Sequence, residues 1–251
     1  MTEREPENMM FFITGGSASG KSEYAEKLAE KLAFSQGGGQ KNGRKRKRSD
    51  VQNGSGTDAL IPLLYLATMR NDGEEAQLRI ERHRQQREGR GFQLLEAPTP
   101  DRLEDVPACR VILLDCLSNF TANTLFSDVC GNVRDDGCRN IGDGRNGGKT
   151  VLEVTEKILR LRDRCKHLVI VADAVFSDGM VYEWETERYI RILGDICAIL
   201  ARQAEYIIEV VFGLPVFLRK AERRKNGETD ISETDTPDAD TPDANGGGVS
   251  R

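Results

Sequence analysis

Short apolar runs alternate with helical stretches along most of the chain. Runs suited to buried strands lie at 9–13, 61–68, 110–115, 167–175 and 206–213, with a shorter extended piece at 92–97. Helical stretches begin at about residues 21 and 118 and span 74–88, 151–164 and 185–203. This alternation predicts an α/β fold in which helices cover both faces of a mostly parallel sheet.

Three stretches interrupt this alternation. Residues 35–60 are rich in Gly, Asn, Lys and Arg, residues 127–149 are rich in Gly, Asp and Asn, and residues 221–251 contain the acidic tandem DTPDADTPDA. We therefore expect one domain at 1–220 with flexible insertions at about 35–60 and 127–149, and a disordered acidic tail at 221–251. The basic run Lys45–Arg48 resembles a nuclear-localisation or polyanion patch, but a solvated charge cluster is the favoured interpretation.

Composition narrows the class of protein. The chain has 251 residues, a net charge of −5, six cysteines and two histidines. The acidic balance argues against nucleic acid as the main partner, and no apolar run approaches the ~20 residues of a membrane span. The cysteines form no C-x-x-C pair, which argues against a structural zinc site. With the polar N-terminus MTEREPEN, these features predict a cytoplasmic protein with free thiols.

A phosphate-binding motif follows the first apolar run. Residues 15–22 match G-x-x-x-x-G-K-[ST], lie between a predicted strand and a predicted helix, and comprise Gly15, Gly16, Ser17, Ala18, Ser19, Gly20, Lys21 and Ser22. Backbone N–H groups of such a loop and the helix N-terminus bind phosphates. Lys21 is the predicted catalytic cation at the β- and γ-phosphates, and Ser22 a predicted Mg²⁺ ligand. The motif predicts a P-loop nucleotide-binding protein that uses ATP or GTP; a glycine-rich turn without phosphate is the disfavoured alternative.

Acidic residues lie at or near the carboxyl ends of two further predicted strands. In a parallel sheet, ligands bind at the carboxyl ends of the strands, and Asp115 and Asp173 are expected there beside the P-loop. Asp115 ends the run VILLD, which has the form of a Walker B strand, so it is a predicted Mg²⁺ ligand opposite Ser22. The alternative is that Asp115 caps the helix that follows.

A histidine lies on the basic helix predicted at 74–88. Arg79, His83 and Arg87 are four residues apart and share one helix face. The two arginines disfavour the protonated imidazole, and neutral imidazole is the form that could attack the α-phosphate of a nucleotide. Spacing alone, however, favours a surface histidine on a basic helix.

Several segments together change that balance. They resemble the bifunctional adenosylcobinamide kinase/adenosylcobinamide-phosphate guanylyltransferase of cobalamin biosynthesis. The segments are ITGGSASGKS, LYLAT, RIERHRQQR followed by FQLLEAP, ILLDCLSNFTANTLF, and the region from VFSDGMVYEWETERY to VFGLPVFLR. The resemblance covers most of residues 9–219, apart from the two insertions. It implies a P-loop α/β enzyme, commonly a homotrimer, that phosphorylates adenosylcobinamide and passes GMP from GTP to the product through a GMP-histidine intermediate.

The resemblance also implies roles for particular residues. His83 corresponds to the catalytic histidine that takes the GMP. Further nucleotide-binding positions are Ala67, Thr68, Met69, Arg84, Gln85, Gln86, Arg87, Glu96 and Asp115. Adenosylcobinamide, GTP or ATP, and Mg²⁺ are the implied small molecules.

The sequence departs from the family's pattern at three sites. Asp173-Ala174 replaces its usual Asn-Glu, Leu94 replaces a threonine, and Ala18 stands where the P-loop often has arginine. Two alternatives therefore stay open: a P-loop kinase for another small molecule, with His83 idle, and a catalytically impaired nucleotide-binding protein.

Overall fold

The structure is a computed structural model that describes residues 8–34, 60–70, 73, 77–78, 81, 85, 87, 89–130, 145–175 and 179–220. The predicted tail at 221–251, nearly all of the predicted insertion at 35–60 and much of the predicted helix at 74–88 lie outside these residues. Within the described ranges, no helix is both long and apolar enough to cross a bilayer.

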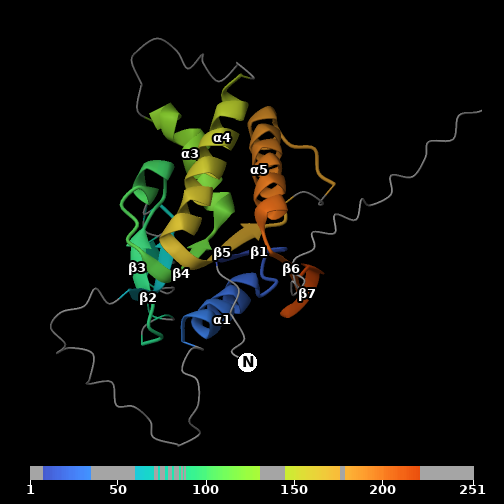
Figure 1. Cartoon of the computed structure of the whole chain (residues 1–251). Helices are drawn as coiled ribbons and strands as arrows, with labels where there is room; N and C mark the ends of the chain where they lie inside the picture. The colour runs from blue at the N-terminus through green and yellow to red at the C-terminus, as the bar shows by residue number, and fades with distance from the viewer. Residues whose placement is uncertain are drawn as a thin grey trace, which may run out of the picture. The chain divides into compact units, whose positions relative to one another are not determined.

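The strands form a seven-stranded sheet in the order β3-β2-β4-β5-β1-β6-β7 (Figure 1). Neighbouring strands are parallel except β6 and β7, which are antiparallel. Their bounds are β1 Met9–Gly15, β2 Ile61–Ala67, β3 Gln93–Glu96, β4 Cys109–Asp115, β5 Cys165–Asp173, β6 Tyr206–Val211 and β7 Leu214–Arg219. The predicted P-loop α/β class, with a mostly parallel sheet, is confirmed.

Helices cover both faces of this sheet. In Figure 1, α1 (Lys21–Phe34) lies on one face of the sheet, and α3 (Leu117–Cys130), α4 (Arg145–Arg160) and α5 (Trp184–Gln203) lie on the other. Short 3₁₀ turns lie at Pro100–Leu103 (η1) and Leu161–Arg164 (η2). Successive strand residues point to opposite faces, so Phe12 joins the core beneath α3, α4 and α5 while Phe11 joins the core beneath α1. Central strands buried on both sides need continuous apolar runs, which is why those runs were visible in the sequence.

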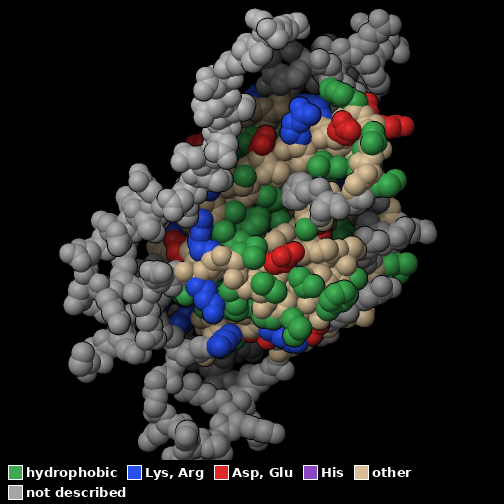
Figure 2. All heavy atoms as spheres, turned by 90° about the vertical axis from the view of Figure 1, so that its right-hand side faces the viewer, with side chains coloured by type: hydrophobic (Ala, Val, Ile, Leu, Met, Phe, Trp, Pro, Cys, Tyr) green, Lys and Arg blue, Asp and Glu red, His purple; other side chains and the backbone are tan. Residues whose placement is uncertain are grey.

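Two parts of the fold differ from the sequence prediction. The pattern did not predict β7, whose six residues are all exposed and include Pro215, so it has neither alternation nor a buried run. Its apolar side chains contribute to the hydrophobic area on the lower part of the face in Figure 2. Helix α3 extends to Cys130 and α4 begins at Arg145, so helical residues enter both ends of the 127–149 stretch predicted as an insertion. Gly147 and Gly148 had favoured a loop there.

Strand order determines what meets at the carboxyl edge of the sheet. β5 lies between β1 and β4, with Gly15 in register with Asp173 and Asp115 in register with Val171. β2 pairs with β4 on the other side, where Ala67 is opposite Asp115. The P-loop, both strand-terminal aspartates and the end of β2 therefore lie along one edge.

Candidate active site

The P-loop closes tightly between β1 and α1. A side chain at Gly15 would place its Cβ only 2.6 Å from the carbonyl oxygen of Val210, so this position accepts glycine alone without a shift of β6. Gly20 has φ +88°, a left-handed conformation that glycine adopts readily. The N–H of Ser19 donates to Gly16 O at 3.2 Å, and the N–H of Gly213 donates to Ser19 O at 2.8 Å. The β6–β7 turn thus supports the loop from outside.

Lys21 points into the site from the first turn of α1. The residue is 8% exposed, and its ammonium donates to Gly16 O at 3.1 Å and pairs with Asp173 Oδ1 at 2.7 Å. The sequence had placed Asp173 at this edge without predicting the ion pair. The lysine is therefore held next to the phosphate loop, as the motif requires.

Ser22 and Asp115 also meet as predicted. Ser22 Oγ lies 3.3 Å from Asp115 Oδ1, and the Tyr65 hydroxyl donates to Asp115 Oδ2 at 2.9 Å. Burial raises the pKa of Asp115, against the hydrogen bond from Tyr65, and burial together with Asp115 raises the pKa of Tyr65 well above 10. The carboxylate thus lies in a site where an added cation would stabilise its ionised form.

These two side chains fit the requirements of Mg²⁺. The ion prefers oxygen ligands and usually keeps several waters and substrate phosphates in its shell. Ser22 and Asp115 offer a hydroxyl and a carboxylate side by side. Across the described ranges, no group of three or more His, Cys, Asp and Glu side chains could hold a metal. The arrangement suits an ion that arrives with a nucleotide rather than one held by the protein alone.

Arg87 is buried within the protein's own contacts. Its Nε lies 2.7 Å from Glu26 Oε1, its Nη2 donates to the Tyr65 hydroxyl at 2.7 Å, and its guanidinium stacks 3.7 Å from the centre of the Tyr65 ring. Arg90 pairs with the other oxygen of Glu26 at 2.5 Å, and Arg87 Nη2 lies 3.8 Å from Asp115 Oδ2. The resemblance had indicated Arg87 as a GTP contact; the structure places it in an ion-pair cluster that joins α1, β2 and β4.

Thr68 also uses its side chain within the protein. It is fully buried, its hydroxyl donates to the carbonyl oxygen of Cys116 at 2.9 Å, and it accepts from the N–H of Cys116 at 2.8 Å. Asn123 donates to the backbone oxygen of Thr68 at 2.7 Å. These bonds tie the ends of β2 and β4 together at the wall of the cavity, which Ala67 and Met69 also line.

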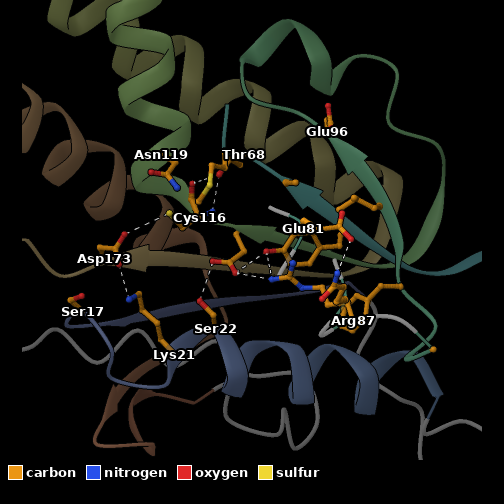
Figure 3. Close-up of a pocket in the computed structure, with 18 residues that line it drawn as sticks. Ser17, Lys21, Ser22, Thr68, Glu81, Arg87, Glu96, Cys116, Asn119 and Asp173 are labelled. Carbon is orange, nitrogen blue, oxygen red and sulfur yellow. Dashed lines mark hydrogen bonds and ion pairs between the residues drawn. The ribbon is translucent and has the colours of Figure 1, made fainter. Parts of the chain in front are cut away.

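One large cavity runs along this edge of the sheet (Figure 3). Its volume is about 1210 Å³, above the roughly 300–1,000 Å³ of most small-molecule sites. Predicted site residues that line it are Ser17, Lys21, Ser22, Ala67, Thr68, Met69, Gln85, Arg87, Glu96 and Asp115. Gly15, Gly16, Ala18, Ser19 and Gly20 complete the adjoining loop, whereas His83, Arg84 and Gln86 lie outside the described residues.

Other lining residues were not predicted as site residues. They are Tyr65, Glu81, Gly89, Phe92, Leu94, Cys116 and Asn119. Asp173 also lines the cavity, and the sequence had placed it at this edge without assigning it a role. The sequence also did not single out Glu26, the partner of Arg87. Glu26 follows Ser22 by four residues, and this spacing places both on one face of α1. Tyr65 and Phe92 sit in strand-like apolar runs, where nothing in the pattern distinguishes a cavity wall from core.

Comparison with known proteins finds one matching family and a similar bacterial protein. The family described as CobU, cobinamide kinase / cobinamide phosphate guanyltransferase, matches residues 37–218, a stretch that begins after the P-loop and includes the segment around His83. The chain is 26% identical over 214 residues to the bifunctional adenosylcobalamin biosynthesis protein CobU of Escherichia coli strain K12, covering 84% of this chain and all of that protein.

Solved structures resemble the fold more distantly. The flagellar accessory protein FlaH from Methanocaldococcus jannaschii matches with a TM-score of 0.42 and 11% identity, over 86% of this chain and 80% of that one. A KaiC-like protein from Pyrococcus horikoshii OT3 matches with a TM-score of 0.39 and 13% identity, over 81% and 73%.

Proposed function

Because this chain belongs to the CobU family of cobinamide kinases / cobinamide phosphate guanyltransferases, we propose that it carries out two reactions on one corrinoid substrate. It phosphorylates adenosylcobinamide from ATP or GTP, and it transfers GMP from GTP to the resulting adenosylcobinamide phosphate. The product is adenosylcobinamide-GDP.

One observation supports this proposal above the others. The same cavity is lined by Lys21 and Ser22 of the P-loop and by Glu81 and Gln85, which flank the position of His83 along the chain. A phosphate-binding end and a histidine-bearing segment beside one cavity are what a kinase and a guanylyltransferase with shared substrates require. Its volume leaves room for more than a nucleotide.

In the kinase reaction, the aminopropanol hydroxyl of adenosylcobinamide attacks the γ-phosphorus of the nucleotide. The bond between the hydroxyl oxygen and phosphorus forms as the bond from phosphorus to the β–γ bridging oxygen breaks, and the nucleoside diphosphate leaves. Lys21 and the N–H groups of the P-loop stabilise the charge that builds up on the transferred group.

In the guanylyl transfer, an imidazole nitrogen of His83 attacks the α-phosphorus of GTP and pyrophosphate leaves. A phosphate oxygen of adenosylcobinamide phosphate then attacks the same phosphorus, and the phosphorus–nitrogen bond to His83 breaks. Ser22 and Asp115 would hold Mg²⁺, which would supply positive charge to offset that of the phosphates. The buried Arg87 anchors the chain four residues beyond His83.

Labelling with α-³²P-GTP tests the histidine directly. The wild-type protein is expected to retain acid-labile label after denaturing electrophoresis, and His83→Ala is expected to lose it. His167→Gln is the matched control, because His167 is the other histidine of the chain and lies within β5. Label that persists in His83→Ala, or that disappears in His167→Gln while the protein remains folded, would contradict the assignment.

We further expect a cytoplasmic homotrimer, as the family resemblance implies. Sedimentation equilibrium would give about three times the 27.9 kDa of one chain. A monomer at micromolar concentration would contradict this expectation without affecting the assignment of the reactions.

A further inference from the structure

Tyr65 lies between the P-loop end of the cavity and the ion-pair cluster around Arg87. It belongs to β2, lines the cavity and is 4% exposed. Tyr65 is in register with Leu113 of β4, and residues two apart on a strand point to the same face of a sheet. The side chains of Tyr65 and Asp115 therefore share the face that α1 covers, and the phenol reaches across to the end of β4.

The hydrogen bonds of the Tyr65 hydroxyl have a fixed direction. A guanidinium carries donors only, so the phenol oxygen accepts from Arg87 Nη2 at 2.7 Å. The single hydroxyl proton is then donated to Asp115 Oδ2 at 2.9 Å. In Figure 3, dashed lines connect Ser22 with Arg87 through these contacts. One carboxylate oxygen of Asp115 is thus held by Tyr65, while the other faces Ser22 at 3.3 Å.

Tyr65 also separates two buried groups of opposite charge. Arg87 Nη2 lies 3.8 Å from Asp115 Oδ2, and the two side chains are 9% and 11% exposed. That distance exceeds the roughly 2.7–2.9 Å of a hydrogen bond between two charged groups. The Tyr65 hydroxyl binds both groups at shorter distances, so it occupies the position where the guanidinium and the carboxylate would otherwise meet.

We infer that Tyr65 is a positioning residue for the Mg²⁺ site, a role that rests on the binding of Mg²⁺ and nucleotide in the proposed function. Its hydroxyl holds Oδ2 of Asp115 and thereby keeps Oδ1 turned toward Ser22, where the two oxygens can bind an ion that arrives with the nucleotide. The same hydroxyl keeps the carboxylate from forming a direct ion pair with Arg87. Tyr65 therefore acts on the reaction through Asp115.

Removal of the hydroxyl should produce a specific defect. In Tyr65→Phe, Arg87 loses an acceptor and Asp115 loses a donor, and a small movement of either side chain would bring the two charges into direct contact. The carboxylate would then turn toward Arg87 and away from Ser22. The contacts of Lys21 lie elsewhere, with the P-loop backbone and the end of β5, so binding of the phosphates themselves should persist.

Nucleotide binding with and without Mg²⁺ tests this role. The fluorescent analogue mant-ATP is titrated into the wild-type protein and Tyr65→Phe, in EDTA and over a series of Mg²⁺ concentrations. Loss of a hydrogen-bond partner of a metal ligand typically lowers metal affinity about 10- to 100-fold, and we expect the half-saturating Mg²⁺ concentration to rise by that factor. The half-saturating Mg²⁺ concentration for adenosylcobinamide phosphorylation should rise in parallel. The Kd for mant-ATP in EDTA and the turnover at saturating Mg²⁺ should stay close to the wild-type values.

Two further variants complete the experiment. Tyr206→Phe is the matched control, because it removes a phenol hydroxyl at the amino end of β6, away from the cavity, and keeps the ring that stacks on Phe11. Its Mg²⁺ dependence should equal that of the wild type. The double variant Tyr65→Phe/Arg87→Met also removes the arginine that would capture Asp115, so it should recover part of the Mg²⁺ affinity that Tyr65→Phe loses.

Three results would overturn the inference. They are an unchanged Mg²⁺ dependence in Tyr65→Phe, an equal weakening of mant-ATP binding in EDTA and in Mg²⁺, which a merely structural role predicts, and the absence of any recovery in the folded double variant. A wild-type protein that binds mant-ATP with Mg²⁺ but does not phosphorylate adenosylcobinamide would instead overturn the proposed function and leave the role of Tyr65 in place.

Discussion

The ion-pair cluster around Arg87 gives the sharpest prediction about structure. Arg87 and Glu26 are 9% and 10% exposed in their side chains and lie 2.7 Å apart. We consider Arg87→Met, which keeps an unbranched apolar side chain against Tyr65 but removes the charge, and Glu26→Gln, which keeps the shape of the carboxylate. Each change leaves a buried charged partner behind.

The expected cost follows from which partners remain. Removing one member of a buried ion pair typically costs ~3–5 kcal/mol, because the other charge is left uncompensated. In Arg87→Met, Glu26 keeps Arg90 at 2.5 Å, so we expect a loss at the low end of this range, about 3 kcal/mol. In Glu26→Gln, Arg87 loses its contact at 2.7 Å, and the Asp115 oxygen lies farther away at 3.8 Å, so we expect a larger loss.

A double-mutant cycle by urea unfolding measures the pair itself. For two directly contacting buried side chains, we expect a coupling free energy of about 2 kcal/mol, well above the ~0.5 kcal/mol seen for independent sites. Glu23 and Lys27 provide the control on the same helix: they form an exposed pair at 2.6 Å and should show no measurable coupling.

The cycle also decides between two roles of Arg87. If Arg87 were mainly a nucleotide ligand, Arg87→Met would weaken GTP binding and hardly change the free energy of unfolding. If Arg87 is instead a structural anchor, Arg87→Met will lower the free energy of unfolding and hardly change GTP binding. A coupling free energy between Arg87 and Glu26 as small as that of the Glu23–Lys27 control would contradict a stabilising role of the buried ion pair.

Three further predictions concern other parts of the site. Lys21→Ala should lower phosphoryl-transfer turnover by at least about a hundredfold, because the transferred group loses its main side-chain cation; near-normal turnover would exclude a catalytic P-loop. Thr68→Val should destabilise the protein by about 1–3 kcal/mol in thermal unfolding, because the buried Thr68 hydroxyl no longer accepts from the N–H of Cys116 or donates to its carbonyl oxygen, and an unchanged midpoint would contradict that bridge. Deleting residues 37–56 should leave activity nearly intact, since loop closure changes by only ~0.6 kcal/mol per doubling of length; an inactive or unfolded product would show that the stretch is required.

Much of this site could be predicted because its signals are local. The P-loop needs glycines, a lysine and a serine at fixed spacing, and continuous apolar runs mark the strands on either side. That Ser22 would face Asp115 followed from one further rule, the alignment of strand ends in a parallel sheet. The observed distance of 3.3 Å between their oxygens agrees with that prediction.

The remaining contacts depend on packing between distant segments. Glu26 and Arg87 are 61 residues apart, and no periodicity shows that a glutamate on α1 will bind an arginine beyond β2. The Lys21–Asp173 pair follows from the insertion of β5 between β1 and β4, which the order of elements along the chain does not determine. β7 was missed because an exposed edge strand lacks the buried pattern by which the other strands were found.

The cavity walls also connect the two ends of the site. One carboxylate oxygen of Asp115 accepts a hydrogen bond from Ser22, and the other accepts one from the Tyr65 hydroxyl. That hydroxyl in turn accepts a hydrogen bond from Arg87. The end of the segment that carries His83 is therefore fixed to the residue pair that faces the P-loop, through hydrogen bonds between buried groups. Because buried bonds of this kind are costly to break, the distance between the phosphate loop and that segment is set by the core of the fold. The two reactions proposed above act on one corrinoid substrate and need that distance to stay constant, and this cluster provides a physical means of keeping it so.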